Sequence, residues 1–162
     1  MELATLPMEE LAPLLQLQLD NGGTANLVVT GNSMHPTLRH RRDIVTLIPV
    51  ERPLRRGDLI LYTRKSGQYV LHRIVTKPKN GAFICSGDNQ WVPENVEESQ
   101  VKALVESYIR NGKVIPVDSL CCRLWVSFWV AVFPIRRPLM IPRRLLGRLR
   151  KKLKKRKTTT SV

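Results

Sequence analysis

DLILYTRKSGQYVLHRIVT, residues 58–76, contains two short runs rich in Val, Ile, Leu and Tyr, one on each side of the turn signal KSG. β-branched and aromatic residues are enriched in strands, and a glycine-containing turn between two such runs is typical of neighbouring strands. The stretch therefore predicts the strands DLILYT and YVLHRIVT.

The same pattern continues on both sides of this stretch. Turn signals such as RRGD, KNG and SGDN separate the runs, and Asn111-Gly112 is the strongest hairpin signal because both residues tolerate positive φ. The other predicted strands are NLVVT (26–30), DIVTLIPV (43–50), AFIC (82–85) and VKALVESYIR (101–110), with KVIPV closing the sheet at about Val117. The fold class is therefore mainly β.

The N-terminal stretch MELATLPMEELAPLLQLQL predicts a short amphipathic helix that packs on the sheet. It carries acidic residues where a secretory signal would carry basic ones, so we expect no cleavable signal there. DNGG follows, and a glycine in the left-handed conformation commonly ends a helix. The leucines predicted to share one face are Leu11, Leu14, Leu15 and Leu19, and the predicted C-cap glycines are Gly22 and Gly23.

Composition changes after Asp118. The run 120–133 is apolar and aromatic, but it is shorter than the roughly 20 residues that span a bilayer and it contains Arg123. One reading is a buried terminal helix. The other is an interfacial helix whose aromatic side chains lie at headgroup depth, namely Trp125, Phe128, Trp129 and Phe133.

The net charge of +14 is concentrated at the C-terminus. Of the 27 Lys and Arg residues, twelve lie from Arg136 onward with no Asp or Glu, which leaves 15 basic against 13 acidic residues elsewhere. Leucine and isoleucine recur among these cations at roughly helical spacing, so this tail predicts a second amphipathic helix on an anionic membrane. A solvated end is the plain alternative, and nucleic acid ranks below the membrane because the aromatic cluster lies just upstream.

These changes predict three segments: an N-terminal helix at 1–24, a β domain at 25–117 and a C-terminal membrane-surface segment at 118–162. Cys85 and the adjacent Cys121 and Cys122 offer no disulfide framework and no metal-ligand spacing, which favours a reducing compartment. We expect neither a cofactor nor a metal.

Ser33 lies in TGNSMHP, residues 30–36, directly after a predicted strand. Pro36 fixes its own φ and restricts His35, while Met34 is suited to anchor the segment in the core. A loop serine is more often a turn residue than a nucleophile, and a free hydroxyl needs a base near neutral pH. The rigid context makes Ser33 a candidate nucleophile.

His72 is the one histidine of three within a predicted strand. Strand alternation places it on one face with Val70 and Ile74. The plain reading is a core histidine satisfied by a carbonyl group, but an imidazole among apolar neighbours stays neutral and is able to accept a proton. We expect His35 and His40 to lie at the surface.

Three segments in order resemble the boxes of type I signal peptidases and the related self-cleaving, LexA-like repressor peptidases. GNSMHPTL resembles their serine box, GDLILYTRKSGQYVLHRIV their second and third boxes, and CSGDNQWVPE the last. Part of this superfamily uses lysine as general base, whereas the endoplasmic-reticulum, archaeal and sporulation-associated branch uses histidine followed by arginine. With His72-Arg73, the chain resembles the histidine branch.

The resemblance implies a signal peptidase/LexA-like β domain with Ser33 as acylating nucleophile and His72 as general base. A carboxylate would hold the histidine, and the last box supplies Asp88 and Glu94, of which Asp88 is slightly favoured as the shorter group. An Asx-turn and a solvated loop charge are their plain readings. Where part of the family has a hydroxyl that assists the oxyanion hole, this chain has Gly31, so the Ser33 N–H would carry most of that stabilisation, with help from Thr30 or Asn32.

The expected function is therefore serine endopeptidase cleavage that removes a signal or leader peptide, bound in extended form, with small side chains next to the cut. No N-terminal anchor is evident, so we expect a peripheral or monotopic membrane protein, otherwise a cytoplasmic one. The competing hypothesis is an inactive peptidase-like binding module whose basic tail binds an anionic membrane or nucleic acid.

Overall fold

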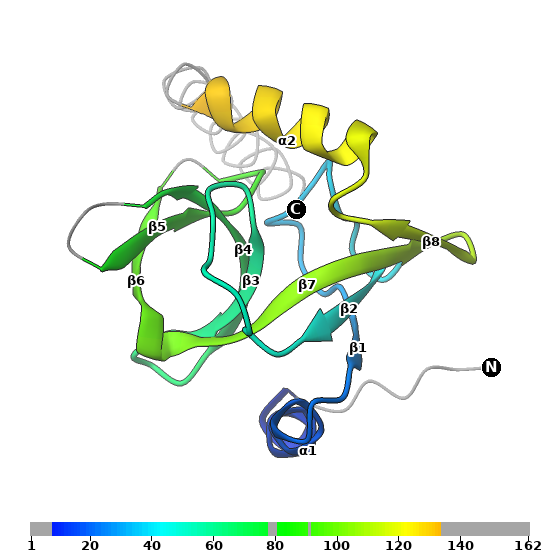
Figure 1. The fold of residues 1–162 in the computed structure, drawn as a ribbon, viewed down its shortest axis with the longest axis vertical. Helices are drawn as coiled ribbons and strands as arrows, with labels where there is room; N and C mark the ends of the chain where they lie inside the picture. The colour runs from blue at the N-terminus through cyan, green and yellow to red at the C-terminus, as the bar shows by residue number, and fades with distance from the viewer. Residues whose placement is uncertain (1–7, 78–80, 91, 134–162) are drawn as a thin grey trace, which may run out of the picture.

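The computed structural model describes residues 8–77, 81–90 and 92–133. Figure 1 shows a curled antiparallel sheet between two helices, α1 (Met8–Asp20) and α2 (Leu120–Ala131). A single 3-10 turn, η1 (Glu98–Gln100), precedes the longest strand. The strands are β1 (Ala25–Val28), β2 (Ile44–Ile48), β3 (Leu59–Thr63), β4 (Tyr69–Thr76), β5 (Ala82–Ser86), β6 (Glu94–Glu97), β7 (Val101–Arg110) and β8 (Lys113–Pro116). The mainly β prediction is confirmed.

All strand pairs are antiparallel, in the order β1-β2-β7-β3-β4-β5-β6, with β8 paired to β7. The two strands predicted on either side of KSG form the β3–β4 hairpin, and its register places Ile60 opposite His72. Asn111 and Gly112 both have positive φ and join β7 to β8, as the sequence predicts. One strand was not predicted: β6 pairs with β5, so Glu94 begins a strand and is not a solvated loop charge.

Two apolar clusters fill the two sides of the sheet. One lies between α1 and strands β1, β2, β3 and β7, and the other fills the ring formed by β3, β4, β5 and β6 in Figure 1. The ring cluster comprises Leu54, Ile60, Tyr62, Ile74, Phe83, Cys85, Val96 and Leu104. β4 separates the clusters, so its middle is buried on both faces. His72 therefore begins the buried part of this strand, residues 72–75.

Helix α1 packs on the sheet through Leu15 and Leu19, and Gly22 adopts the predicted left-handed conformation after it. The prediction for Leu14 is wrong, because this side chain is exposed. At about 100° per residue, Leu11, Leu15 and Leu19 lie within an arc of about 80°, and Leu14 lies about 60° beyond Leu11, on the side away from the buried pair. Leu11 is half-buried, at the rim of that arc.

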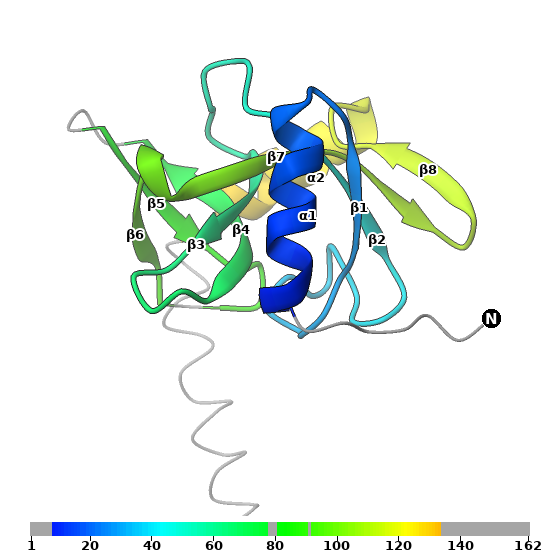
Figure 2. The same cartoon turned by 90° about the horizontal axis from the view of Figure 1, so that it is seen from below.

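Helix α2 lies on the opposite side of the sheet from α1 (Figures 1 and 2). Val126 contacts the β2–β3 turn so closely that a Cβ at Gly57 would lie 2.8 Å from it. Val130 and Phe133 pack against Val75, so the expectation that Phe133 lies at headgroup depth is wrong. Trp129 is half-buried, while Trp125 and Phe128 are exposed.

No helix among the described residues is both long and apolar enough to cross a membrane. The second predicted C-terminal helix, built on Leu139, Ile141, Leu145, Leu146, Leu149 and Leu153, lies outside the described residues.

Candidate active site

The loop that carries Ser33 connects β1 to β2, and backbone hydrogen bonds join its first and last residues. At its base, Val29 N–H donates to the Asp43 carbonyl (2.9 Å) and Arg41 N–H donates to the Val29 carbonyl (2.8 Å). Within the loop, Met34 is buried, as predicted. These contacts make the segment that leaves Ser33 a fixed part of the fold.

Asp43 closes this loop onto the sheet. It is fully buried and accepts hydrogen bonds from the Arg39 N–H (3.0 Å), from Arg42, and from Arg110 of β7 (2.7 Å). Burial alone would raise the pKa of this carboxyl, but the bonds from Arg42 and Arg110 outweigh it and hold the pKa far below its usual range. Asp43 is therefore a charged anchor, and sequence reasoning did not find it.

A second loop, between β5 and β6, grips the backbone around Ser33. Asn89 N–H donates to the Ser33 carbonyl (2.7 Å), and the Asn89 side-chain amide donates to the Asn32 carbonyl (3.1 Å). A Cβ atom at Gly87 would lie 2.6 Å from the Ser33 carbonyl oxygen and 3.1 Å from His72 Nε2. The serine loop, the β5–β6 loop and the imidazole thus meet at one point.

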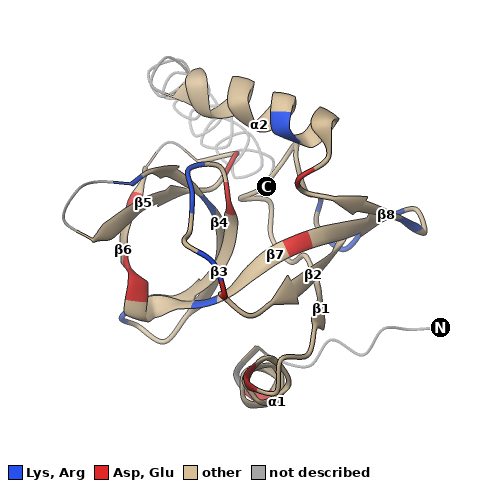
Figure 3. Ribbon diagram, in the orientation of Figure 1, with Lys and Arg blue, Asp and Glu red and all other residues tan. Residues whose placement is uncertain are grey.

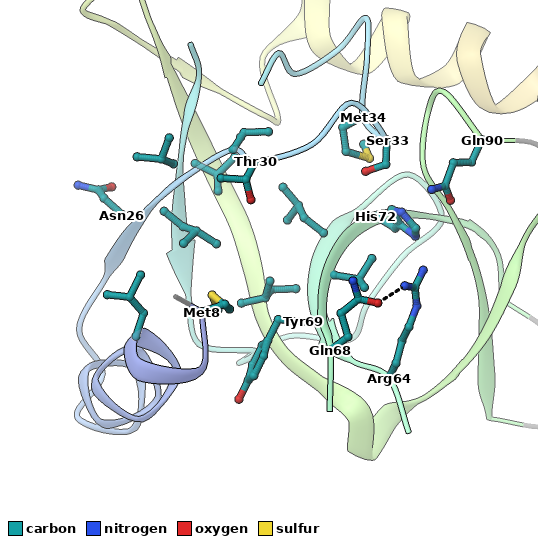
Figure 4. A pocket seen from close by; sticks show the side chains of 18 residues that line it. Met8, Asn26, Thr30, Ser33, Met34, Arg64, Gln68, Tyr69, His72 and Gln90 are labelled. Carbon is teal, nitrogen blue, oxygen red and sulfur yellow. Dashed lines mark hydrogen bonds between the residues drawn. The ribbon is translucent and has the colours of Figure 1, made fainter. Parts of the chain in front are cut away.

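Ser33 and His72 both line the pocket drawn in Figure 4, whose volume is about 510 Å³. The Ser33 side chain lies beside the His72 ring at one end of it (Figure 4). The pocket is walled by β1, by residues 68–72, and by Met8 and Leu11 of α1. The structure therefore brings the predicted nucleophile and the predicted base together in a cleft.

His72 is almost completely buried. Burial lowers its pKa to about 4, although the charges of Glu94 and Asp88 favour the protonated form and Arg64 opposes it. The imidazole is therefore neutral near pH 7, the state that a general base requires. His35 and His40 are exposed, as predicted, and His40 Nδ1 accepts a hydrogen bond from the Gly31 N–H (2.8 Å).

The two candidate carboxylates have different partners. Asp88 is buried and accepts two hydrogen bonds from Arg73, at 3.0 and 2.9 Å, so it joins the β5–β6 loop to β4. Glu94 Oε1 lies 3.9 Å from His72 Nδ1. Of the two, the charge of Glu94 acts more strongly on the imidazole. The geometry favours Glu94 as the group beside His72, where the sequence slightly favoured Asp88.

Tyr62 and Arg64 complete this side of the site, and sequence reasoning missed both. The Tyr62 hydroxyl lies 3.0 Å from His72 Nδ1 and donates to Glu94 Oε2 at 3.0 Å. Arg64 donates to both Glu94 oxygens and thereby lowers the pKa of Glu94. Ile60 pairs with His72, and strand alternation puts Tyr62 on the same face as Ile60. The hairpin register would therefore have indicated Tyr62 as a neighbour of His72.

The family model described as Peptidase S24-like matches residues 3–115, a range that contains Ser33, His72, Asp88 and Glu94. The match covers more than half of the chain, and the protein belongs to the Peptidase S24-like family. Its β domain, with an N-terminal and a C-terminal helix, has the fold expected for that family. No curated protein matches the sequence.

The lowered pKa of His72 predicts a pH-dependent stability. Between about pH 6.5 and about pH 4 the unfolded chain protonates this residue while the folded chain does not. The free energy of unfolding should therefore fall as the pH falls through that window, by up to about 1.4 kcal/mol per pH unit. Urea unfolding of wild type and His72→Gln from pH 7 to pH 4.5 measures it.

The His72→Gln variant should show a flatter pH dependence, because it lacks the titrating group. His35→Gln, which replaces an exposed histidine, should follow wild type. Parallel curves for wild type and His72→Gln would contradict the assignment of a neutral, buried imidazole.

Proposed function

We propose that the protein is a serine endopeptidase in which Ser33 is the nucleophile, His72 the general base and Glu94 the supporting carboxylate. The observation that carries the proposal is the placement of Ser33 and the neutral imidazole side by side in one pocket, with the Gly87 backbone against both. Membership of the Peptidase S24-like family supports it.

The chemistry follows from these positions. The Ser33 hydroxyl oxygen attacks the scissile carbonyl carbon while His72 Nε2 takes its proton. Collapse of the tetrahedral intermediate breaks the C–N bond, and the imidazolium returns the proton to the leaving amine. Water, deprotonated by the same nitrogen, then hydrolyses the ester and regenerates Ser33. Glu94 stabilises the transient positive charge on His72.

The oxyanion would form beside the serine backbone. The Gly31 N–H donates to His40 Nδ1 and is therefore not available to the oxyanion. We assign the main stabilisation to the Ser33 N–H, with Thr30, which also lines the pocket, as the nearby hydroxyl. Loss of one such donor costs about 2.7 to 4 kcal/mol in well-studied hydrolases, so a site with few donors would turn over slowly.

The pocket suits a peptide in extended form. Among the described residues, β1 pairs only with β2, and β4 pairs with β5 only from Arg73 onward. Residues 69–71 and β1 therefore present strand edges along the same pocket. A peptide laid between them would pair with these backbones as an added strand. We propose a signal or leader peptide with small side chains next to the cut, cleaved as in the histidine-base branch.

The expected result is covalent labelling of the full-length protein by an active-site serine acylating probe. Ser33→Ala should abolish labelling, and His72→Gln should slow it by about 100-fold or more, the usual contribution of a general base. Two exposed residues supply matched controls, Ser66→Ala and His35→Gln, which should label like wild type. Intact-mass measurement over time gives the rates.

Equal labelling of wild type, Ser33→Ala and His72→Gln would end the enzyme proposal. A wild type that neither labels nor cleaves peptides would favour the alternative, an inactive peptidase-like module whose basic tail binds an anionic membrane or nucleic acid.

We also propose that α2 lies on an anionic membrane surface. Its outer face exposes Leu120, Leu124 and Phe128, which are 71%, 64% and 58% exposed and recur every four residues. Arg123 is the one charged residue of α2, and Figure 3 shows the helix otherwise uncharged. Twelve basic residues follow from Arg136 onward. An apolar face followed by cations is complementary to anionic lipid.

The α2 surface also lies close to the serine loop, because Trp125 Nε1 donates to Thr37 Oγ1 at 3.0 Å. A membrane at α2 would therefore hold the cleft near substrates that emerge from lipid. We therefore propose that the protein is a peripheral or monotopic membrane protein.

Replacing Leu124 or Phe128 with Glu should weaken binding to vesicles that contain anionic phosphatidylglycerol by about tenfold or more. Burying either side chain contributes about 1.5–3 kcal/mol, and 1.4 kcal/mol is a factor of ten. Val114→Glu, on an exposed valine of the β7–β8 hairpin, is the matched control and should bind like wild type. Undiminished co-sedimentation of both α2 variants would show that the membrane contact lies elsewhere.

A further inference from the structure

Tyr62 occupies the space between the imidazole and its carboxylate. The aromatic side chain of Tyr62 is buried in the apolar cluster enclosed by β3, β4, β5 and β6. Its hydroxyl lies 3.0 Å from His72 Nδ1 and 3.0 Å from Glu94 Oε2. Glu94 Oε1 itself is 3.9 Å from Nδ1, which is too far for a direct hydrogen bond. The phenol therefore bridges two groups that do not bond to each other at this distance.

We propose that Tyr62 is a positioning residue that relays the carboxylate of Glu94 to His72 and holds the imidazole in the tautomer whose proton is on Nδ1. The consequence for catalysis rests on the proposed peptidase function. The tautomer itself follows from the hydrogen-bond geometry alone.

The proton positions follow from the donors and acceptors. An ionised carboxylate only accepts hydrogen bonds, and Arg64 holds Glu94 in that form by donating to both of its oxygens. The single phenol proton is therefore directed to Glu94, as the geometry assigns it. The Tyr62 oxygen is left as an acceptor toward Nδ1, and a neutral imidazole satisfies it by carrying its one proton there.

Nε2 is then unprotonated and available as an acceptor. This nitrogen lies next to Gly87 and the Ser33 backbone, since a Cβ at Gly87 would lie 3.1 Å from it and the Ser33 carbonyl oxygen is adjacent. The bridge thus points the basic nitrogen at the serine before any substrate arrives. When Nε2 takes the proton from Ser33, Nδ1–H continues to donate to the phenol, and Glu94 stabilises the positive charge through it.

The register of the β3–β4 hairpin indicates Tyr62 beside His72, but it does not indicate Glu94, because the two ends of the bridge come from different hairpins. Tyr62 comes from β3, His72 from β4 and Glu94 from β6, and only the curled sheet brings the three together. The arrangement differs from a serine-histidine-carboxylate triad, in which the carboxylate bonds to the imidazole directly.

The direct test is ¹⁵N NMR of the imidazole nitrogens in full-length protein that carries Ser33→Ala, near pH 7. The chain has three histidines, and loss of signals in His72→Gln assigns those of His72. We expect Nδ1 to be protonated and Nε2 to be unprotonated. Tyr62→Phe keeps the ring and removes the hydroxyl, and it should shift the population toward the Nε2–H tautomer. Tyr108→Phe, at another buried tyrosine, should leave the shifts unchanged.

Acylation kinetics provide the second measurement. Tyr62→Phe should lower the rate of Ser33 acylation by about 10- to 100-fold, the worth of one hydrogen bond to a charged group. Glu94→Gln acts at the other end of the bridge and should cost a similar factor. Because both variants interrupt one relay, the double variant should be little slower than either single one.

The proposal is overturned by an Nε2–H tautomer in the Ser33→Ala protein, or by a Tyr62→Phe spectrum identical to the parent. A slower Tyr62→Phe with an unchanged tautomer would also overturn it, since the loss would then reflect packing alone. If the wild-type protein acylates no probe, the peptidase proposal fails, yet the NMR result still decides the tautomer. The two failures are therefore distinguishable.

Discussion

The backbone of Gly87 lies so close to Ser33 and His72 that no side chain fits between them. A Cβ there would meet the Ser33 carbonyl oxygen at 2.6 Å and His72 Nε2 at 3.1 Å, both inside normal contact distance. The hydrogen bond from Asn89 N–H to the same carbonyl, at 2.7 Å, holds the contact closed. Loops far apart in the chain can deliver a hydroxyl to an imidazole only because this position has no side chain.

Buried ion pairs hold in place the two loops that meet at Gly87, the serine loop and the β5–β6 loop. Asp43 ties the serine loop to β7 through Arg110, and Asp88 ties the β5–β6 loop to β4 through Arg73. A carboxylate buried with its partners is costly to disrupt, because removal of one member leaves the other unsatisfied. These pairs therefore specify the geometry of the site, while the apolar clusters on either side of β4 supply most of the stability.

Local pattern was enough to predict most strands, the β7–β8 turn, the Met34 anchor and the pairing of Ser33 with His72 as candidates. Local sequence pattern did not predict positions that depend on strand register or on the curvature of the sheet. Glu94 looked like a loop charge because β6 is short and polar, and its place beside His72 arises only when β5 and β6 curl toward β3. Leu14 was misplaced because a leucine-rich helix offers more apolar residues than one face can bury.

The most direct test of the close contact between Gly87, Ser33 and His72 is the substitution Gly87→Ala. The Gly87→Ala protein should fold, but its Ser33 acylation by a serine-directed probe should fall by about 100-fold or more, because the added methyl group pushes the serine loop away from the base. Gly67→Ala places its Cβ in open space, although Gly67 has a positive φ that Gly87 lacks. This control adds a methyl group without the contact and should keep the wild-type rate. Wild-type acylation by a folded Gly87→Ala protein would contradict the account.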